Sequence, residues 1–240
     1  MRLIWVLLNL GVWTVLLSLV GMVVSLFEWR GRFFGWIARL WSRIILRAAG
    51  VRYTVRGLDQ LNRQGHYVFA CNHESAFDIP LAFAGLPYQL APISKIELRK
   101  IPFFGWAMIL ARHVFIDRRN HEQAVAALQR AKESLERNPR SVLVFPEGTR
   151  SLDGKVHEFK RGGIVLALEA GLPLVPVAVC GTSQVAQKGR WELHPARVEL
   201  RVGAPIDTTR LTYGDRKRVA ESLRQQVVDM KTAWERQRAA

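Results

Sequence analysis

The chain begins with a long apolar segment that predicts a membrane helix. Residues 3–27 carry no charged side chain, and as one α-helix they would measure about 37 Å, against about 30 Å for the hydrocarbon core of a bilayer. A cleaved signal peptide would have a shorter apolar run and a small-residue cleavage site, and residues 27–30 offer no such site. Small residues also recur every three or four positions along one face, which favours close packing against a second helix. We therefore expect a retained anchor.

The next segment, residues 32–49, has the pattern of a basic amphipathic helix. Its arginines share one face, its bulky apolar residues lie mostly elsewhere and tryptophans lie nearby, as in helices at the surface of an anionic membrane. The arginines are Arg32, Arg39, Arg43 and Arg47. We predict a two-helix membrane anchor over residues 1–50; the alternative is one straight span followed by a surface helix. The arginine-rich flank predicts that the rest of the chain is cytoplasmic.

From residue 51 onward the pattern changes to that of a soluble domain, which we predict to extend over residues 51–240. Short apolar or β-branched runs predict strands at residues 51–55, 67–70, 89–93, 113–116, 141–145, 174–179 and 198–202. Helical periodicity near residues 120–135 and 219–234 predicts helices there. This alternation predicts an α/β fold: one domain with a central, mostly parallel or mixed sheet flanked by helices.

The net charge narrows the set of partners without choosing among them. Lys and Arg number 35 against 20 Asp and Glu, and the formal charge of +15 predicts a polyanionic partner: nucleic acid, an anionic membrane or a phosphorylated substrate. Because the densest arginine cluster follows the membrane segment, and no basic stretch interleaves aromatic residues in the manner of an RNA-recognition strand, we expect no nucleic-acid partner. The sequence also lacks the serine-hydrolase elbow, the P-loop and the H-E-x-x-H zinc motif.

A first candidate site follows the strand predicted at residues 67–70. His73 and Asp78 lie five positions apart, so on one regular helix they would point about 140° apart. They can pair only if His73 lies in a turn and Asp78 in the first turn of a helix. An imidazole held by a carboxylate can remove the proton of a hydroxyl group during acyl transfer. Taken alone, a neighbouring His and Asp more often form a structural hydrogen bond.

A second candidate site, residues 145–151, follows another predicted strand. Gly148 allows a ligand to approach the backbone, Arg150 offers a planar fork suited to phosphate, and Thr149 offers a hydroxyl group. On residue types alone, an ordinary turn with a solvated arginine is the alternative.

Together these segments resemble the glycerolipid acyltransferase family, most closely its bacterial 1-acylglycerol-3-phosphate acyltransferases, the PlsC type. The family's N-H-x-S-x-x-D motif stands at residues 72–78, and its F-P-E-G-T-R-S motif is complete at residues 145–151. Five shorter motifs of the family are also present: K-x-E-L at residues 95–98, I-P-x-F-G at 101–105, F-I-D-R at 115–118, F-K-x-G at 159–162 and V-P-V at 175–177. One departure is Arg112-His113, where family members usually carry a small residue or glycine.

The resemblance implies a reaction and a set of site residues. In the family the histidine takes the proton from the lysolipid hydroxyl, which attacks the acyl thioester, and the aspartate orients the imidazole; here these are His73 and Asp78. The resemblance further implies an acceptor site formed by Arg118, Glu147, Gly148, Thr149 and Arg150, with Lys95 assisting in phosphate binding. Because the thioester is already activated, we expect no metal and no cofactor.

The resemblance also implies partners and a location. The acyl donor would be a thioester of acyl carrier protein or coenzyme A, and the acceptor lysophosphatidic acid, so that the product is phosphatidic acid for phospholipid synthesis. We expect the chain among phospholipids of the bacterial inner membrane, with its catalytic domain on the cytoplasmic side. Two alternatives stay open: an acyltransferase for glycerol 3-phosphate or another lysolipid such as lyso-ornithine lipid, and a non-enzymatic phospholipid-binding protein.

Overall fold

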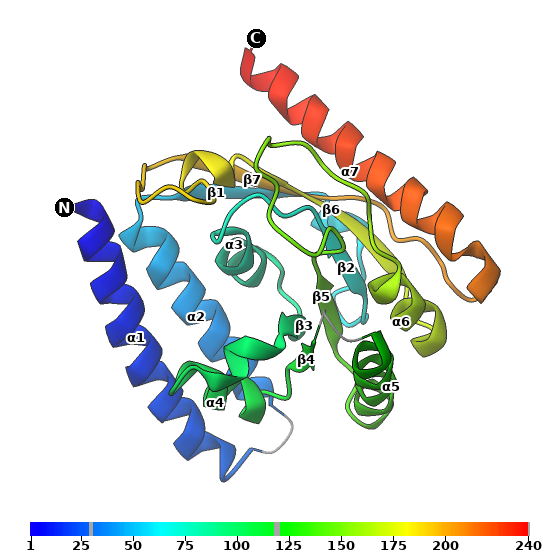
Figure 1. Ribbon diagram of the computed structural model, residues 1–240, viewed down its shortest axis with the longest axis horizontal. Coiled ribbons are helices and arrows are strands. Elements are labelled where there is room, and N and C mark those ends of the chain that lie inside the picture. Colours follow the sequence, from blue (N-terminus) through cyan, green and yellow to red (C-terminus); the bar gives the residue numbers. More distant parts are fainter. Residues whose placement is uncertain (29–30, 118–120, 240) are drawn as a thin grey trace.

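A central sheet organises the chain (Figure 1). The computed structural model describes residues 1–28, 31–117 and 121–239, and these form a seven-stranded sheet with helices on both faces. Its strands lie in the order β1 (Arg52–Arg56), β7 (Arg197–Val202), β6 (Leu174–Cys180), β2 (Val68–Cys71), β5 (Ser141–Val144), β3 (Leu90–Lys95) and β4 (Val114–Ile116). Neighbouring strands are parallel except β6 and β7, which are antiparallel. The predicted α/β fold is therefore confirmed, and each predicted strand is present within two residues of its expected bounds.

The two faces of the sheet carry separate apolar cores. Side chains alternate between faces along a strand, so Phe69 and Cys71 of β2 pack with α2 (Arg32–Ala48) and α3 (Asp78–Gly85). Val68 and Ala70 of the same strand pack with the helices of the other face, which are α5 (His121–Arg137), α6 (Gly162–Ala170) and α7 (Arg216–Ala239). All four strand residues are buried, as expected for a parallel strand covered on both faces.

Short 3-10 segments connect several of these elements. Among the described residues they are η1 (Leu58–Gln60), η2 (Ile96–Lys100), η3 (Thr182–Gln184) and η4 (Tyr213–Asp215). One further helix, α4 (Phe104–Leu110), follows η2 and lies beside the N-terminal helix.

The N-terminal residues form the predicted pair of helices. α1 (Arg2–Ser25) packs against α2, and the side-chain nitrogen of Trp41 donates a hydrogen bond of 3.0 Å to Thr14 Oγ1. A Cβ on Gly21 would lie 2.6 Å from the ring of Phe34, so the small residues of α1 do allow close packing. α1 is the one helix of the described residues that is long and apolar enough to cross a membrane. The division into an anchor of residues 1–50 and a catalytic domain stays a prediction.

The basic face expected on α2 is interrupted by one residue. Arg32, Arg43 and Arg47 are exposed, but Arg39 is half-buried and its guanidinium donates to the carbonyl oxygen of Tyr88 at 3.1 Å. The expectation that all four arginines face the membrane surface is therefore wrong at Arg39, because this part of α2 packs against the domain that contains the sheet.

Candidate active site

The candidate residues meet at one edge of the sheet. β2, β5 and β3 are neighbours and run in parallel, so their carboxyl ends lie together, which is the usual place for a site in an open α/β sheet. His73 follows β2, Arg150 lies on the loop after β5, and Lys95 is the last residue of β3. The topology therefore assembles residues that are far apart in the sequence.

His73 and Asp78 form the pair that the sequence predicted. His73 lies in the turn after β2, Asp78 is the first residue of α3, and His73 Nδ1 lies 2.7 Å from Asp78 Oδ2. The same carboxylate oxygen accepts the backbone N–H groups of Glu74 and Ser75 at 2.7 and 2.9 Å, while Oδ1 accepts the hydroxyl of Thr182. Because a carboxylate accepts all four bonds, Nδ1 carries the imidazole proton and Nε2 presents a lone pair.

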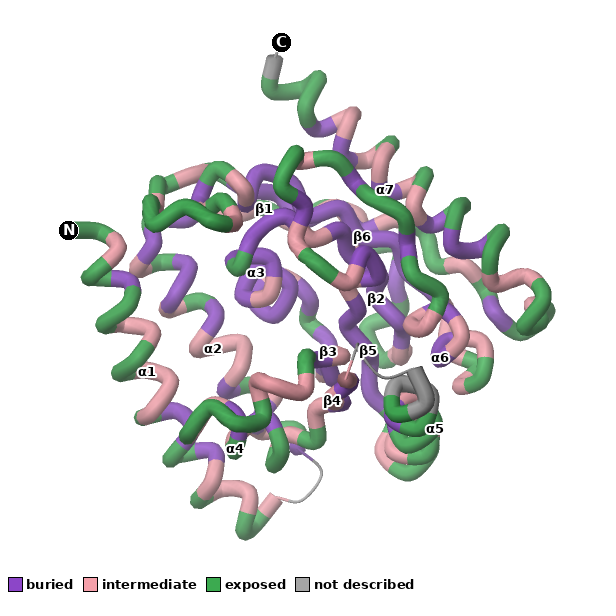
Figure 2. The backbone as a smooth tube through the Cα atoms, viewed as in Figure 1, coloured by how far each residue is buried: buried purple, intermediate pink, exposed green. Residues whose placement is uncertain are grey.

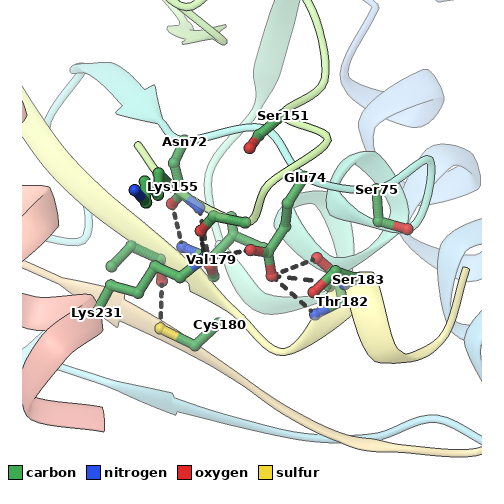
Figure 3. Close-up of polar contacts among 12 residues, drawn as sticks. Asn72, Glu74, Ser75, Ser151, Lys155, Val179, Cys180, Thr182, Ser183 and Lys231 are labelled. Carbon is green, nitrogen blue, oxygen red and sulfur yellow. Dashed lines mark hydrogen bonds and ion pairs between the residues drawn. The ribbon is translucent and has the colours of Figure 1, made fainter. Parts of the chain in front are cut away.

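The other residues of this motif fix the shape of the turn. The side-chain amide of Asn72 donates to the carbonyl oxygen of Val179 at 2.9 Å and accepts its N–H at 2.7 Å, which ties the end of β2 to β6 (Figure 3). Ser75 Oγ donates to the carbonyl oxygen of Ala186 at 2.7 Å and accepts the N–H of Phe77. The ring of His73 stacks on Phe145, with centroids 4.3 Å apart. These contacts hold the imidazole in place.

A buried ion pair stabilises the turn that follows β2. The side chain of Glu74 accepts the N–H of Thr182 at 3.1 Å and pairs with Lys231 of the C-terminal helix α7 (Figure 3). Lys231 Nζ also donates to the carbonyl oxygen of Gly154 at 2.7 Å. Both charged side chains are almost fully buried. The sequence did not predict this pair. More than 150 positions separate the two residues, and the residues around each of them do not indicate a partner elsewhere in the chain.

Glu147 supports the same turn and does not face the cavity. One of its carboxylate oxygens accepts the N–H of His73 at 2.7 Å and the other accepts the N–H of His157 at 3.0 Å. Burial raises the pKa of Glu147, and the two amide bonds oppose that rise. Glu147 therefore fixes the position of the His73 backbone.

The loop after β5 carries the candidate anion-binding groups. Gly148 has a φ of +75°, in the left-handed region that glycine adopts without strain, which explains the glycine at this position. Lys188 Nζ donates to Thr149 Oγ1 at 3.1 Å and to the carbonyl oxygen of Arg150 at 3.3 Å. Sequence reasoning missed Lys188, which lies on an irregular loop outside any motif. It adds a cation beside Arg150.

A cavity of about 580 Å³ joins these groups to the helices. His73, Lys95, Gly148, Thr149, Arg150 and Lys188 line its polar wall, whereas Asp78 lies behind His73. α1, α2, α3 and α4 supply an apolar wall that includes Leu17, Phe34, Trp41, Phe83, Phe104 and Met108. The apolar wall was not predictable from a residue run, because it draws single residues from many elements.

One of the two residues that depart from the family's pattern, His113, also lines the cavity. Arg112 has a φ of 58°, a left-handed conformation that glycine adopts more easily, so the residue usual in the family suits this backbone. His113 lines the cavity and its ring stacks against that of Phe83 at 6.4 Å. Burial, helped by nearby Arg140, lowers the pKa of His113 to about 3, so its ring is neutral near pH 7. Arg118, predicted for the acceptor site, lies outside the described residues.

Comparisons with known proteins agree with this fold and site. A family model named Acyltransferase matches residues 52–180, from β1 to the end of β6. That range contains His73, Asp78 and the loop of residues 145–151, and the chain belongs to this acyltransferase family.

Relatives and a solved structure extend the similarity. The chain is 32% identical over 197 residues to a 1-acyl-sn-glycerol-3-phosphate acyltransferase of Saccharomyces cerevisiae, covering 81% of this chain and 65% of the relative. It is 33% identical over 172 residues to a protein of the same name from Pseudomonas aeruginosa, covering 72% of this chain and 63% of the relative. The chain thus spans a little under two thirds of these relatives. The crystal structure of PlsC, the 1-acyl-sn-glycerophosphate acyltransferase of Thermotoga maritima, superposes with a TM-score of 0.81 at 28% identity, covering 95% of this chain and 94% of that one.

Proposed function

We propose that this chain transfers a fatty acyl group from a thioester to the free sn-2 hydroxyl of 1-acylglycerol 3-phosphate and so makes phosphatidic acid. One observation carries the proposal: the His73–Asp78 pair lies on a cavity whose wall combines cations with a long apolar lining. A lysolipid that bears a phosphate has the same combination of a polar head and an apolar chain. The names of the relatives support the choice of this acceptor.

The chemistry follows from the protonation of the imidazole. His73 Nε2 accepts the proton of the attacking hydroxyl as its oxygen forms a bond to the thioester carbonyl carbon. When the tetrahedral intermediate collapses, the carbon–sulfur bond breaks and the imidazolium returns the proton to the leaving thiolate. Asp78 keeps Nδ1 protonated and stabilises the imidazolium between the two steps. This reaction is balanced without a metal or cofactor, and we propose that none takes part.

The phosphate of the acceptor would bind the cations of the polar wall. Arg150 offers two N–H donors to a phosphate, and Lys188 and Lys95 add further charge from neighbouring loops. Lys95 lies in an exposed ion pair with Glu97, 3.1 Å apart, so it is placed at the outer rim. Gly148 and Thr149 complete this wall, while Glu147 acts through the backbone of His73.

The apolar helix α1 indicates an association with a membrane. We propose that α1 and α2 hold the site at the cytoplasmic surface of a bacterial inner membrane, since acceptor and product are both bilayer lipids. The exposed arginines of α2 would face anionic phospholipid head groups. The acyl donor, a thioester of acyl carrier protein or coenzyme A, would reach the site from the water.

An acceptor panel tests this proposal. The purified full chain in phospholipid vesicles is given a radiolabelled acyl thioester, in one series on acyl carrier protein and in another on coenzyme A. The acceptors are 1-acylglycerol 3-phosphate, glycerol 3-phosphate, lyso-ornithine lipid and 1-acylglycerol. We expect labelled phosphatidic acid as the main product. A preference for one of the other acceptors would overturn the proposed substrate, and no transfer to any of them would favour a phospholipid-binding protein.

A further inference from the structure

The short helix α4 is apolar on two opposite faces. At about 100° per residue, one face consists of Phe104, Ala107 and Met108, which line the cavity with Ala111 just beyond the helix. Trp106, Ile109 and Leu110 lie on the opposite face, and their exposed fractions are 48, 40 and 39%. Helices that are apolar all round are normally buried on all sides. The outer face of α4 therefore lacks the cover that its composition calls for.

This outer face lies on a helix that packs beside α1, which has many exposed apolar residues of its own. α4 packs beside α1 (Figure 1), and the outward side of α1 is exposed along its length (Figure 2). Ile4, Trp5, Leu8, Val12 and Val23 are among the exposed residues of α1. Ile101, just before α4, is 44% exposed and extends the surface on the catalytic domain. Exposed apolar residues gathered on two neighbouring helices mark a site of contact with a membrane or another protein.

The charges around α4 favour a membrane over a protein partner. Arg99 and Lys100 precede the helix and Arg112 follows it, and all three are exposed. The acidic residue of this stretch is Glu97, and it is paired with Lys95. An apolar surface flanked by cations at both ends is complementary to the interface of an anionic bilayer, where side chains of Lys and Arg reach the head groups.

We propose that the outer face of α4, made of Ile101, Trp106, Ile109 and Leu110, inserts into the same bilayer leaflet as the exposed side of α1. The inference rests on the proposed action on bilayer lipids and extends it from the anchor to the catalytic domain itself. Because the opposite face of α4 lines the cavity, only one helix diameter, about 10 Å, separates the cavity from the hydrocarbon. The contact would hold the site at a fixed depth, whichever lysolipid is the acceptor.

Site-directed fluorescence tests this contact. Ile109→Cys, Val12→Cys and Tyr213→Cys each place a thiol at an exposed position, on α4, on α1 and at η4 before α7. Each full-length variant is labelled with an environment-sensitive fluorophore and bound to vesicles of phosphatidylethanolamine and phosphatidylglycerol, with or without lipids spin-labelled on the acyl chain. We expect about twofold lower fluorescence at positions 12 and 109 with spin-labelled lipid, and no change at position 213.

The three positions separate the possible results. Quenching at positions 12 and 109 but not 213 would support the proposal. Quenching at position 12 alone would overturn it while leaving the anchor intact. Quenching at none would overturn the anchor as well, and quenching at all three would overturn the proposal, because contact with lipid would then not be confined to α1 and α4. Acyl transfer to detergent-dispersed acceptor is measured separately. A failure of the proposed acyl transfer is therefore distinguished from a failure of the membrane contact.

A second variant links the contact to activity. Trp106→Ser, Ile109→Ser and Leu110→Ser are combined, because these three side chains are exposed and do not line the cavity. The matched control makes Tyr213 and Trp191, which are more exposed, into serine. With acceptor in vesicles we expect about tenfold lower transfer by the α4 variant, and an unchanged rate with detergent-dispersed acceptor. Equal loss in both assays, or loss in neither, would contradict the proposal.

Discussion

The polar and apolar walls of the cavity are held by different kinds of interaction. On the polar wall, Asp78 is fully buried and accepts four hydrogen bonds, while Asn72 and Glu147 tie the turn of His73 to β6 and to the next loop. The apolar wall consists of side chains from four helices, which make contacts without direction. The difference indicates where geometry matters: proton transfer needs atoms fixed within tenths of an ångström, whereas a lipid chain needs only a dry surface.

The largest expected effect lies at the buried carboxylate. Asp78→Asn replaces one acceptor oxygen by an NH₂ group, which cannot accept the bonds now made at that position. The imidazole loses the partner that fixes its proton on Nδ1, so we expect kcat to fall about 10³-fold. Steady-state kinetics measures kcat, and the midpoint of thermal unfolding shows whether the variant is folded. A variant that folds normally and keeps its kcat would remove Asp78 from the mechanism.

The ion pair beneath the turn is expected to matter next. Lys231→Met leaves the carboxylate of Glu74 buried without its cation, which costs about 3–5 kcal/mol of unfolding free energy. The double change Glu74→Gln with Lys231→Met removes both charges and should recover most of that loss. Lys217→Met, on an exposed part of the same helix, is the matched control and should change stability by less than about 0.5 kcal/mol.

Denaturant unfolding of these three variants separates the explanations. If Lys231→Met were no less stable than Lys217→Met, the burial of an unpaired charge would not be the controlling effect. If the double change were as unstable as the single one, packing at position 231 would matter more than charge.

A smaller effect is expected at the cations of the polar wall. Arg150→Met and Lys188→Met each remove charged donors to the acceptor phosphate, so we expect KM for 1-acylglycerol 3-phosphate to rise about tenfold or more. KM for the uncharged acceptor 1-acylglycerol should not change. Arg190→Met removes an exposed charge from the same loop as Lys188 and serves as the control. Equal increases for both acceptors would show a general distortion of the site.

The smallest effect is expected from chemistry at the two cysteines. Burial raises the pKa of the Cys71 thiol well above its ordinary value, helped by the nearby Asp78 charge, and burial raises that of Cys180 to about 12. Since the thiolate is the reactive form, iodoacetamide at pH 8 should label neither residue in the folded chain and should leave activity unchanged. Mass spectrometry detects the labels, and the Ile109→Cys variant provides a thiol that reacts. Labelling of Cys71 would show that the sheet edge opens to solvent.

Sequence patterns predicted the parts of the molecule that depend on local order. Alternating or continuous apolar runs predicted all seven strands, because burial on the two faces of a sheet acts on each short segment. The spacing of His73 and Asp78 permitted their pairing only with a turn followed by a helix, and the resemblance to the acyltransferase family implied that they pair; the structure has this geometry.

The contacts that were missed all join distant segments. Lys231 reaches Glu74 only because α7 packs against β6, and Lys188 meets Thr149 only because two loops lie together. Arg39 was expected on an outward face, and the structure turns it toward Tyr88. Such contacts depend on how elements pack, and no residue spacing in one segment encodes them.

The central claim is that His73 is the base for acyl transfer to a bilayer lysolipid, and a single-turnover comparison tests it most directly. Wild-type and His73→Ala chains in vesicles containing 1-acylglycerol 3-phosphate are mixed with acyl thioester, and released thiol and phosphatidic acid are measured together. The account predicts equal amounts of both from the wild type, and rates lower by about 10³-fold from His73→Ala with unchanged vesicle binding. Transfer at the wild-type rate by His73→Ala would contradict it.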